Sequence, residues 1–257
     1  MARIQNTFEV VFNEKLSPRF YRLCLNAPPI ARKIKPGQFI HIRVNDSLEP
    51  FFRRPFSVYR AQKYVEIFYE PIGAGTRTLA LKKKGDFLDV LGPLGNFFSL
   101  PTKEIAQVVM IAGGIGVAPF LILSDVLKKK KKLDIILLYG GRTKGHVYDM
   151  KEFKKNGCKI FVATDDGSVG VRGRVSKLFS KIKFDPETTF IYTCGPSLMI
   201  KTVQEFAKKN NLQGEASCEE VMACALGACL GCSIKTTEGY KTVCYDGPVF
   251  DLGKVIL

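Results

Sequence analysis

Four cysteines near the carboxyl-terminal end constrain this chain more than any other feature of its sequence. Cys224, Cys229, Cys232 and Cys244 follow the spacing C-x4-C-x2-C-x11-C. A zinc site, an iron–sulfur cluster and a disulfide framework are the three structures that such a group can build. The amino terminus, "MARIQNTFEV", lacks the basic-then-apolar layout of a signal peptide, so we expect a cytoplasmic protein. Clustered cysteines in a reducing compartment indicate metal or redox chemistry rather than disulfides.

The spacing of these cysteines favours a 2Fe-2S cluster over zinc. C-x4-C-x2-C is the spacing with which plant-type ferredoxins bind two irons. Structural zinc prefers paired C-x2-C knuckles, and only one such pair is present. Small residues at Ala225, Gly227, Ala228 and Gly231 allow the loop to wrap closely, so that its amides can point at sulfur.

Length and composition indicate a globular chain with two domains and a small appendage. The 257 residues are 46% apolar and 25% charged. Residues 105–124 carry no charge over roughly one bilayer span, but glycines and Pro119 interrupt their centre. A buried strand, a glycine turn and a buried helix explain this stretch better than a membrane span.

The net charge of +15 admits an anionic partner but does not require one. The run "KKKKK" at 128–132 falls at the end of a helix expected over 117–130, where cations complement the helix dipole. Aromatic residues are not interleaved with the basic ones, so the sequence predicts no nucleic-acid module.

Residues 1–100 read as short strands separated by glycine and proline turns, which predicts an antiparallel barrel. These strands are rich in Val, Ile, Phe and Tyr, and several alternate with period two. We expect them at 7–13, 20–27, 38–44, 64–70 and 86–92.

Residues 101–213 change to continuous apolar runs separated by helical stretches, which predicts a doubly wound α/β domain with a parallel sheet. We expect strands at 107–112, 134–140, 159–164 and 189–195, and helices at 117–130, roughly 173–182, and 196–209. Residues 214–257 hold too little apolar material for a core of their own and form a lobe organised by what the cysteines bind.

Small and polar residues follow the predicted parallel strands, which indicates a nucleotide site. "GGIGVAP" at 113–119 is a glycine turn before a helix, although Pro119 stands where a third glycine of the dinucleotide fingerprint would be. "YGGR" at 139–142, "TDDGS" at 164–168 and "CGPSLM" at 194–199 end the other strands. Ligands of open α/β sheets bind beyond such strand ends.

Two segments of the barrel favour a phosphate-bearing cofactor. "RRPFSVY" at 53–59 begins a strand with two arginines and a proline. Arg54 could neutralise a phosphate, and Ser57 could hydrogen-bond the edge of a cofactor ring. "GAGT" at 73–76 is a second backbone cradle for an anion.

These motifs in this order resemble the ferredoxin-reductase family of flavoproteins, and the tail "EEVMACALGACLGCSIKT…VCYDGPVFD" resembles the electron-transfer subunits of dihydroorotate dehydrogenase B over essentially the whole chain. The resemblance implies an FAD-binding barrel at 1–100, an NAD-binding domain at 101–213 and a 2Fe-2S lobe at 214–257.

The resemblance also implies residue roles. Ser57 near the flavin N5 and Cys194 near the nicotinamide would be catalytic. FAD would be held by Arg54, Pro55, Phe56, Ser57, Tyr69, Gly75 and Thr76. NAD(H) would contact Gly114, Gly116, Asp166, Cys194, Gly195 and Pro196. The cluster would be bound by Cys224, Cys229, Cys232 and Cys244. Ala225 and Val221 depart from the glycine and arginine expected in this tail, and neither is a ligand.

The implied function is a redox path. A nicotinamide moves two electrons, a 2Fe-2S cluster accepts one, and a flavin converts between them. The implied partner is an FMN-containing catalytic subunit that oxidises dihydroorotate in pyrimidine biosynthesis, in a heterotetramer of two of each subunit, with neither nucleic acid nor membrane involved.

Three alternatives stay open at this point. Similar subunits serve NAD(P)H:ferredoxin oxidoreductases, sulfide dehydrogenases and hydrogenases. The carboxylates of "TDDGS" favour NAD, whereas Arg142 and Arg172 could serve the 2′-phosphate of NADP. A zinc-bearing nucleic-acid-binding regulator is the alternative from another class.

Overall fold

A computed structural model describes residues 3–130, 132–148 and 150–257. Its first part is a closed antiparallel barrel with the strand order β1-β2-β5-β4-β3-β6. The strands are β1 (Ile4–Lys15), β2 (Tyr21–Leu25), β3 (Phe39–Arg43), β4 (Arg54–Ala61), β5 (Val65–Tyr69) and β6 (Phe87–Leu94), and the helices are α1 (Pro28–Ala31) and α2 (Ala74–Ala80). Ile40, Ile42, Val58 and Ile67 fill the barrel because alternate residues of a strand point to one face.

The second part is an open sheet with the order β10-β9-β8-β7-β11-β12-β15. All neighbours in it are parallel except β12 and β15. Its strands are β7 (Gln107–Gly113), β8 (Asp134–Gly141), β9 (Lys159–Thr164), β10 (Val171–Arg172), β11 (Thr189–Cys194), β12 (Gln213–Ser217) and β15 (Val249–Asp251). The predicted barrel and doubly wound sheet are confirmed.

Helical segments connect the strands of this sheet. They are η1 (Gly114–Val117), α3 (Ala118–Leu127), η2 (Lys144–His146), α4 (Met150–Lys155), η3 (Val175–Lys181) and α5 (Ser197–Lys209). The helix expected at 173–182 is a 3-10 helix, in which Val175 and Leu178 are buried three residues apart. The helix expected to reach residue 130 ends at Leu127, and Lys131 of the lysine run lies outside the described residues.

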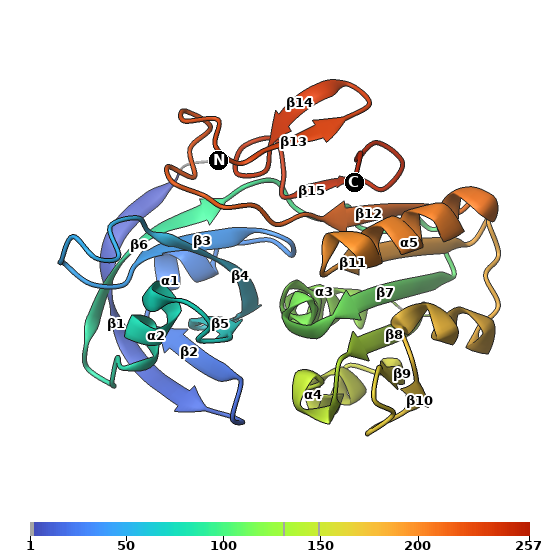
Figure 1. Ribbon diagram of the computed structural model, residues 1–257, viewed down its shortest axis with the longest axis horizontal. Coiled ribbons are helices and arrows are strands. Elements are labelled where there is room, and N and C mark those ends of the chain that lie inside the picture. The colour runs from blue at the N-terminus through green and yellow to red at the C-terminus, as the bar shows by residue number, and fades with distance from the viewer. Residues whose placement is uncertain (1–2, 131, 149) are drawn as a thin grey trace.

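Residues 214–257, here called the cysteine segment, lie across the barrel and the sheet and share their core. Figure 1 shows this segment in red at the top of the view, over both parts. Cys232, Val243 and Cys244 pack in one apolar cluster with Phe39 and Leu94 of the barrel and with residues of β7 and β11. The segment adds the hairpin β13 (Ser233–Thr236) and β14 (Gly239–Thr242). No helix in the described ranges is both long and apolar enough to cross a membrane.

Candidate functional site

A pocket of about 480 Å³ lies where the barrel, the sheet domain and the cysteine segment meet. The barrel lines it with five residues predicted to hold FAD: Pro55, Phe56, Ser57, Tyr69 and Thr76. The sheet domain adds Ile115 and Ala118, and the cysteine segment adds residues 217–222. Three motifs that are far apart in the sequence therefore share one cavity.

Arg54 and Gly75 lie against each other beside this pocket. A Cβ atom on Gly75 would come within 2.6 Å of the Arg54 Nε, so only glycine lets the guanidinium lie over the start of α2. The Thr76 hydroxyl accepts a hydrogen bond from the Gly73 amide at 3.0 Å, which holds this turn in place. A cationic side chain beside a tight glycine turn is a cradle that fits the diphosphate of FAD.

Tyr69 and Phe56 form the aromatic wall of the pocket. Their ring centroids are 5.8 Å apart, in an edge-to-face arrangement. The Tyr69 hydroxyl donates to the Asn13 Oδ1 at 2.9 Å, and burial raises the pKa of this phenol. Tyr69 therefore contributes a neutral, oriented surface and not a titrating group.

The glycine turn after β7 and the Cys-Gly-Pro turn after β11 are packed directly together. A Cβ atom on Gly116 would collide with the carbonyl oxygen of Cys194, and one on Gly113 would lie 2.9 Å from Pro196. Gly114 has a φ of +54° and Gly195 a φ of +152°. In the sheet, β8 lies on one side of β7 and β11 lies on the other, so the order of the strands reverses at β7. Both turns therefore lie at the switch point of the sheet.

Cys194 itself stands at this switch point with its thiol enclosed. The residue has no exposed surface, and its pKa is raised well above the usual range, first by burial and then by the charge of Glu219. The thiol is therefore neutral in the folded protein, and the role predicted for it near a nicotinamide requires no thiolate.

Asp166 lies beyond the end of β9, away from the shared pocket. Its Oδ1 accepts hydrogen bonds from the Ser168 amide at 2.9 Å and the Ser168 hydroxyl at 2.6 Å, which lower the pKa of the carboxyl. β9 is separated from β7 by one strand. A dinucleotide that crosses the carboxyl edge of the sheet would reach this carboxylate at its far end.

The loop that carries the first three predicted cluster ligands is wound so that its amides point at sulfur. The Leu226 amide lies 3.3 Å from the Cys224 Sγ, and the Gly227 amide lies 3.2 Å from the Cys244 Sγ. Ala225 and Leu230 have positive φ values of 55° and 57°, which produce this winding. The amide donors expected from the small residues of the loop are confirmed.

The four thiols lie in two pairs. The Cys229 amide donates to the Cys224 Sγ at 3.5 Å, and the Cys244 amide donates to the Cys232 Sγ at 3.4 Å. In the described part of the chain no three His, Cys, Asp or Glu side chains lie close enough together to hold one metal ion. A 2Fe-2S cluster takes its four thiolates as two on each iron, so this paired arrangement fits it better than a tetrahedral zinc. Burial raises the pKa of Cys224, but backbone amides outweigh it and lower the value to about 6.

The two pairs differ in exposure, which would give a cluster bound there an inner and an outer side. Cys232 and Cys244 are buried, whereas Cys224 is half-buried and Cys229 is exposed. Phe39 packs in the same cluster as the inner pair and also lines the shared pocket. The inner side of the cluster site therefore adjoins the predicted flavin site.

Sequence reasoning missed the residues that the cysteine segment contributes to the pocket, above all Glu219. Its side chain keeps contact with solvent through the open pocket, but neighbouring atoms crowd the carboxyl and raise its pKa. The signal was the pair of glutamates in "CEEVM", directly after β12 and before the first ligand. Val221, the residue that replaces the expected arginine, is 85% exposed at the rim of the same pocket.

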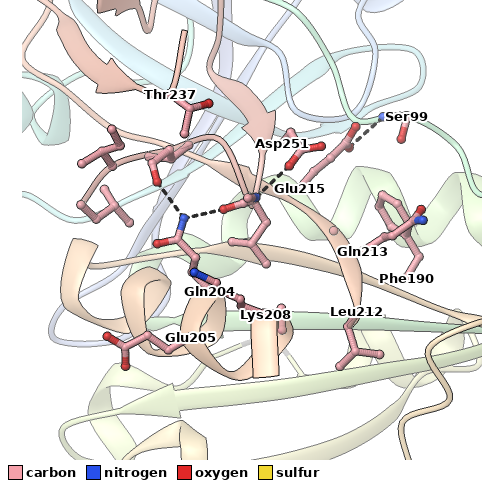
Figure 2. Close-up of a pocket in the computed structure, with 17 residues that line it drawn as sticks. Ser99, Phe190, Gln204, Glu205, Lys208, Leu212, Gln213, Glu215, Thr237 and Asp251 are labelled. Atoms are coloured by element: carbon pink, nitrogen blue, oxygen red, sulfur yellow. Dashed lines mark hydrogen bonds between the residues drawn. The ribbon is translucent and has the colours of Figure 1, made fainter. Parts of the chain in front are cut away.

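A second pocket, of about 800 Å³, lies between α5, β12, β15 and the carboxyl-terminal residues. Figure 2 shows Gln204 reaching from α5 to the backbone of the last segment, where it donates to the carbonyls of Leu252 and Val255 at 2.6 and 2.7 Å. None of the site residues predicted from the sequence lines this pocket. Its contacts attach the end of the chain to the sheet domain.

Comparison with protein families assigns the same two functional regions. Residues 219–256 match the iron-sulfur cluster binding domain of dihydroorotate dehydrogenase B. Residues 110–205 match the oxidoreductase NAD-binding domain.

Two curated relatives match nearly the whole chain. The dihydroorotate dehydrogenase B (NAD(+)) electron transfer subunit of Desulforamulus reducens is 34% identical, with 94% of each chain covered. The subunit of the same name from Bacillus cereus is 36% identical over the full length of both chains.

Solved structures show the same fold. The structure of an NADH-dependent reduced ferredoxin-NADP oxidoreductase matches with a TM-score of 0.85 and 28% identity, covering 97% of this chain and 89% of that one. A ferredoxin NADP+ reductase from Neisseria gonorrhoeae with bound FAD and NADP matches with a TM-score of 0.65 and 20% identity, covering 80% and 91%. The second likeness concerns the fold alone.

Proposed function

Because the chain belongs to the family of dihydroorotate dehydrogenase B electron transfer subunits, we propose that it carries electrons between a catalytic subunit and NAD by way of a 2Fe-2S cluster and FAD. The observation that carries this proposal is the shared pocket. The Arg-Pro-Phe-Ser strand, the glycine turn after β7 and the segment leading to the cysteines all line it. A path that joins three redox groups needs such a meeting point.

Bound FAD would supply the exchange between a two-electron nicotinamide and a one-electron cluster. Arg54 and the turn at Gly75 and Thr76 would neutralise and orient its diphosphate. Ser57 would hydrogen-bond the N5 edge of the ring, and Pro55, Phe56 and Tyr69 would hold the ring in place.

The sheet domain would bind NAD(H) at the switch point of its sheet, where the turns after β7 and β11 meet. The backbone amides of the turn at Gly114 and Gly116 would face the diphosphate, and the Cys194-Gly195-Pro196 turn would border the nicotinamide. Asp166 would accept from a ribose hydroxyl, which suits NAD better than the 2′-phosphate of NADP.

Cys224, Cys229, Cys232 and Cys244 would hold the cluster, and its outer side would meet the partner. Leu226, Leu230 and Tyr245 are 40%, 62% and 61% exposed near the exposed Cys229. We assign this apolar rim to an FMN-containing catalytic subunit that oxidises dihydroorotate to orotate, in a cytoplasmic heterotetramer of two of each subunit. Electrons would enter from that subunit and leave on NAD+, without nucleic acid or membrane.

Reconstitution with the catalytic subunit tests this function. The purified chain, combined anaerobically with that subunit, dihydroorotate and NAD+, should form NADH, and omission of either protein should abolish the reaction. If dihydroorotate oxidation never yields NADH in the presence of this chain, the assignment is wrong.

The likeness to the reduced ferredoxin-NADP oxidoreductase supports one other candidate, in which a ferredoxin replaces the catalytic subunit. The same chain mixed with reduced ferredoxin and NAD+ or NADP+ distinguishes the two. Nicotinamide reduction by ferredoxin, without reduction by the dihydroorotate system, would favour the second candidate.

A further inference from the structure

β4 carries a β-bulge that changes where Arg60 points. Val58 lies opposite Ile67, and Arg60 lies opposite Glu66, so two steps along β4 match one step along β5. Val58 and Ile67 face the barrel interior. Regular alternation would point Arg60 inward as well. The extra residue, Tyr59, reverses the alternation and turns Arg60 outward, as bulges do where a side chain must be re-aimed.

Outside the barrel, Arg60 binds two carboxylates of the sheet domain. Its Nε lies 3.3 Å from the Asp125 Oδ2 of α3, and its Nη2 lies 2.9 Å from the Glu152 Oε2 of α4. The three side chains are only 17%, 16% and 22% exposed, so water screens these pairs less than it screens surface pairs. One guanidinium thus connects the barrel to two helices of the other domain.

The strand and the helix joined by this contact also carry the two cofactor motifs. β4 begins with the Arg-Pro-Phe-Ser motif, and α3 begins directly after the glycine turn. Ser57 and Ala118 line the same pocket. From Ser57 to Arg60 the strand covers roughly 10 Å, and from Ala118 to Asp125 the helix covers roughly the same length.

Apolar contacts occupy the distance between the pocket and the ion pairs. Ile122 of α3 packs into the barrel core, and Tyr59 of β4 packs into the core that contains Phe120 and Leu121. β4 and α3 therefore pack along each other over this length. The cofactor pocket lies at one end of the contact, and the ion pair of Arg60 with Asp125 lies at the other.

We propose that Arg60 is a positioning residue for the step between NADH and FAD, which holds α3 and α4 against β4 so that the glycine turn keeps its place across the pocket from Ser57. The inference rests on the proposed function. Arg60 would act by fixing the distance between the reacting groups, because groups displaced by about 1 Å can lose 100-fold in rate.

The test compares Arg60→Met with wild type and with Arg22→Met as a matched control. Arg22 is also a barrel arginine with two carboxylate partners, Glu14 at 3.3 Å and Glu66 at 3.8 Å, but both belong to the barrel. In anaerobic stopped-flow experiments, flavin reduction at saturating NADH should be about 10-fold slower or more in Arg60→Met. It should stay within about twofold of wild type in Arg22→Met, and Arg60→Lys should restore part of the rate because it keeps the charge.

A purely structural role for Arg60 predicts a different result. In that case Arg60→Met would unfold at a lower temperature, but its bound flavin would be reduced at the wild-type rate. That outcome, or an equal loss of rate in Arg22→Met, would overturn the proposal. If Arg60→Met does not fold, Glu152→Gln removes one partner from the other domain and should slow reduction in the same direction.

Amide hydrogen exchange gives a readout that needs no NADH. Exchange in α3 should be several-fold faster in Arg60→Met than in wild type, with β1 unchanged. Wild-type flavin that NADH does not reduce would contradict the proposed function, whereas unchanged α3 exchange in Arg60→Met would contradict the positioning role.

Discussion

Cys229 is the exposed member of the predicted ligand set, whose other members are half-buried or buried. A cluster held by these cysteines would have Cys229 on its solvent side, where a partner can approach. The small residues of the loop predicted its amide donors to sulfur, and the spacing of the cysteines predicts the ligand set. It could not predict which ligand faces outward, because that depends on how the segment packs on Phe39 and Leu94 of the barrel.

Cys229→Ser should separate the two halves of the redox path. We expect the visible absorbance of the cluster to disappear and transfer to the partner to fall to background, while NADH still reduces the flavin. Cys158→Ala is the control, because Cys158 is buried in the sheet domain away from the cluster. If transfer to the partner survives loss of the cluster, electrons do not pass through it.

His41 is a buried polar residue that no sequence motif indicated. It lies on β3 opposite Pro55 and has no exposed surface. The backbone of Arg53 approaches the ring, but neither ring nitrogen reaches hydrogen-bond geometry with a described residue. Burial lowers its pKa from 6.5 to about 4, and the charges of Arg53 and Arg54 act in the same direction.

This depressed pKa predicts a loss of stability in acid. The unfolded chain takes up a proton on His41 near pH 6.5, and the folded chain takes it up only near pH 4. The stability that neutral His41 contributes to the folded state is therefore complete above pH 6.5 and is lost as the pH falls toward 4. From pH 7 to pH 5 the loss through His41 should be about 2 kcal/mol. Urea unfolding of His41→Phe should show a smaller difference between these pH values than wild type. An identical difference would contradict the assignment.

The elements that were predicted correctly are those whose pattern is local. Continuous apolar runs gave β7, β8, β9 and β11, and glycine turns marked the ends of β7 and β11. β12 was missed because its sequence, QGEAS, holds no apolar run, and β15 and β10 were missed because they have only three and two residues. The motifs of the site were likewise visible one by one, but the pocket that they share depends on the packing of three parts.

The turn after β7 offers a test at the scale of elements. Gly116→Ala would place a methyl group against the carbonyl of Cys194, so the turn and the end of β11 must move apart. We expect a loss of about 1–3 kcal/mol in unfolding free energy together with a raised KM for NADH. Gly145→Ala is the control, since its nearest contact is an ordinary 3.5 Å. Equal effects of the two substitutions would show that this close approach is unimportant.

At the scale of the whole molecule, the cysteine segment joins the barrel to the sheet. Its buried residues belong to a core that includes both, and it supplies a wall of the shared pocket. The segment has too little apolar material for a core of its own, which explains why it rests on the other two parts. The same packing places the inner cysteines beside the predicted flavin site.

The central claim is that one chain holds a connected path from NAD(H) through FAD to a 2Fe-2S cluster. The most direct measurement is the visible spectrum of the anaerobically purified protein before and after addition of NADH, with iron, zinc and flavin assayed on the same sample. We expect flavin bands with a broad shoulder at longer wavelength, about two irons per chain, and bleaching of both features by NADH. A colourless protein that contains zinc would contradict the claim.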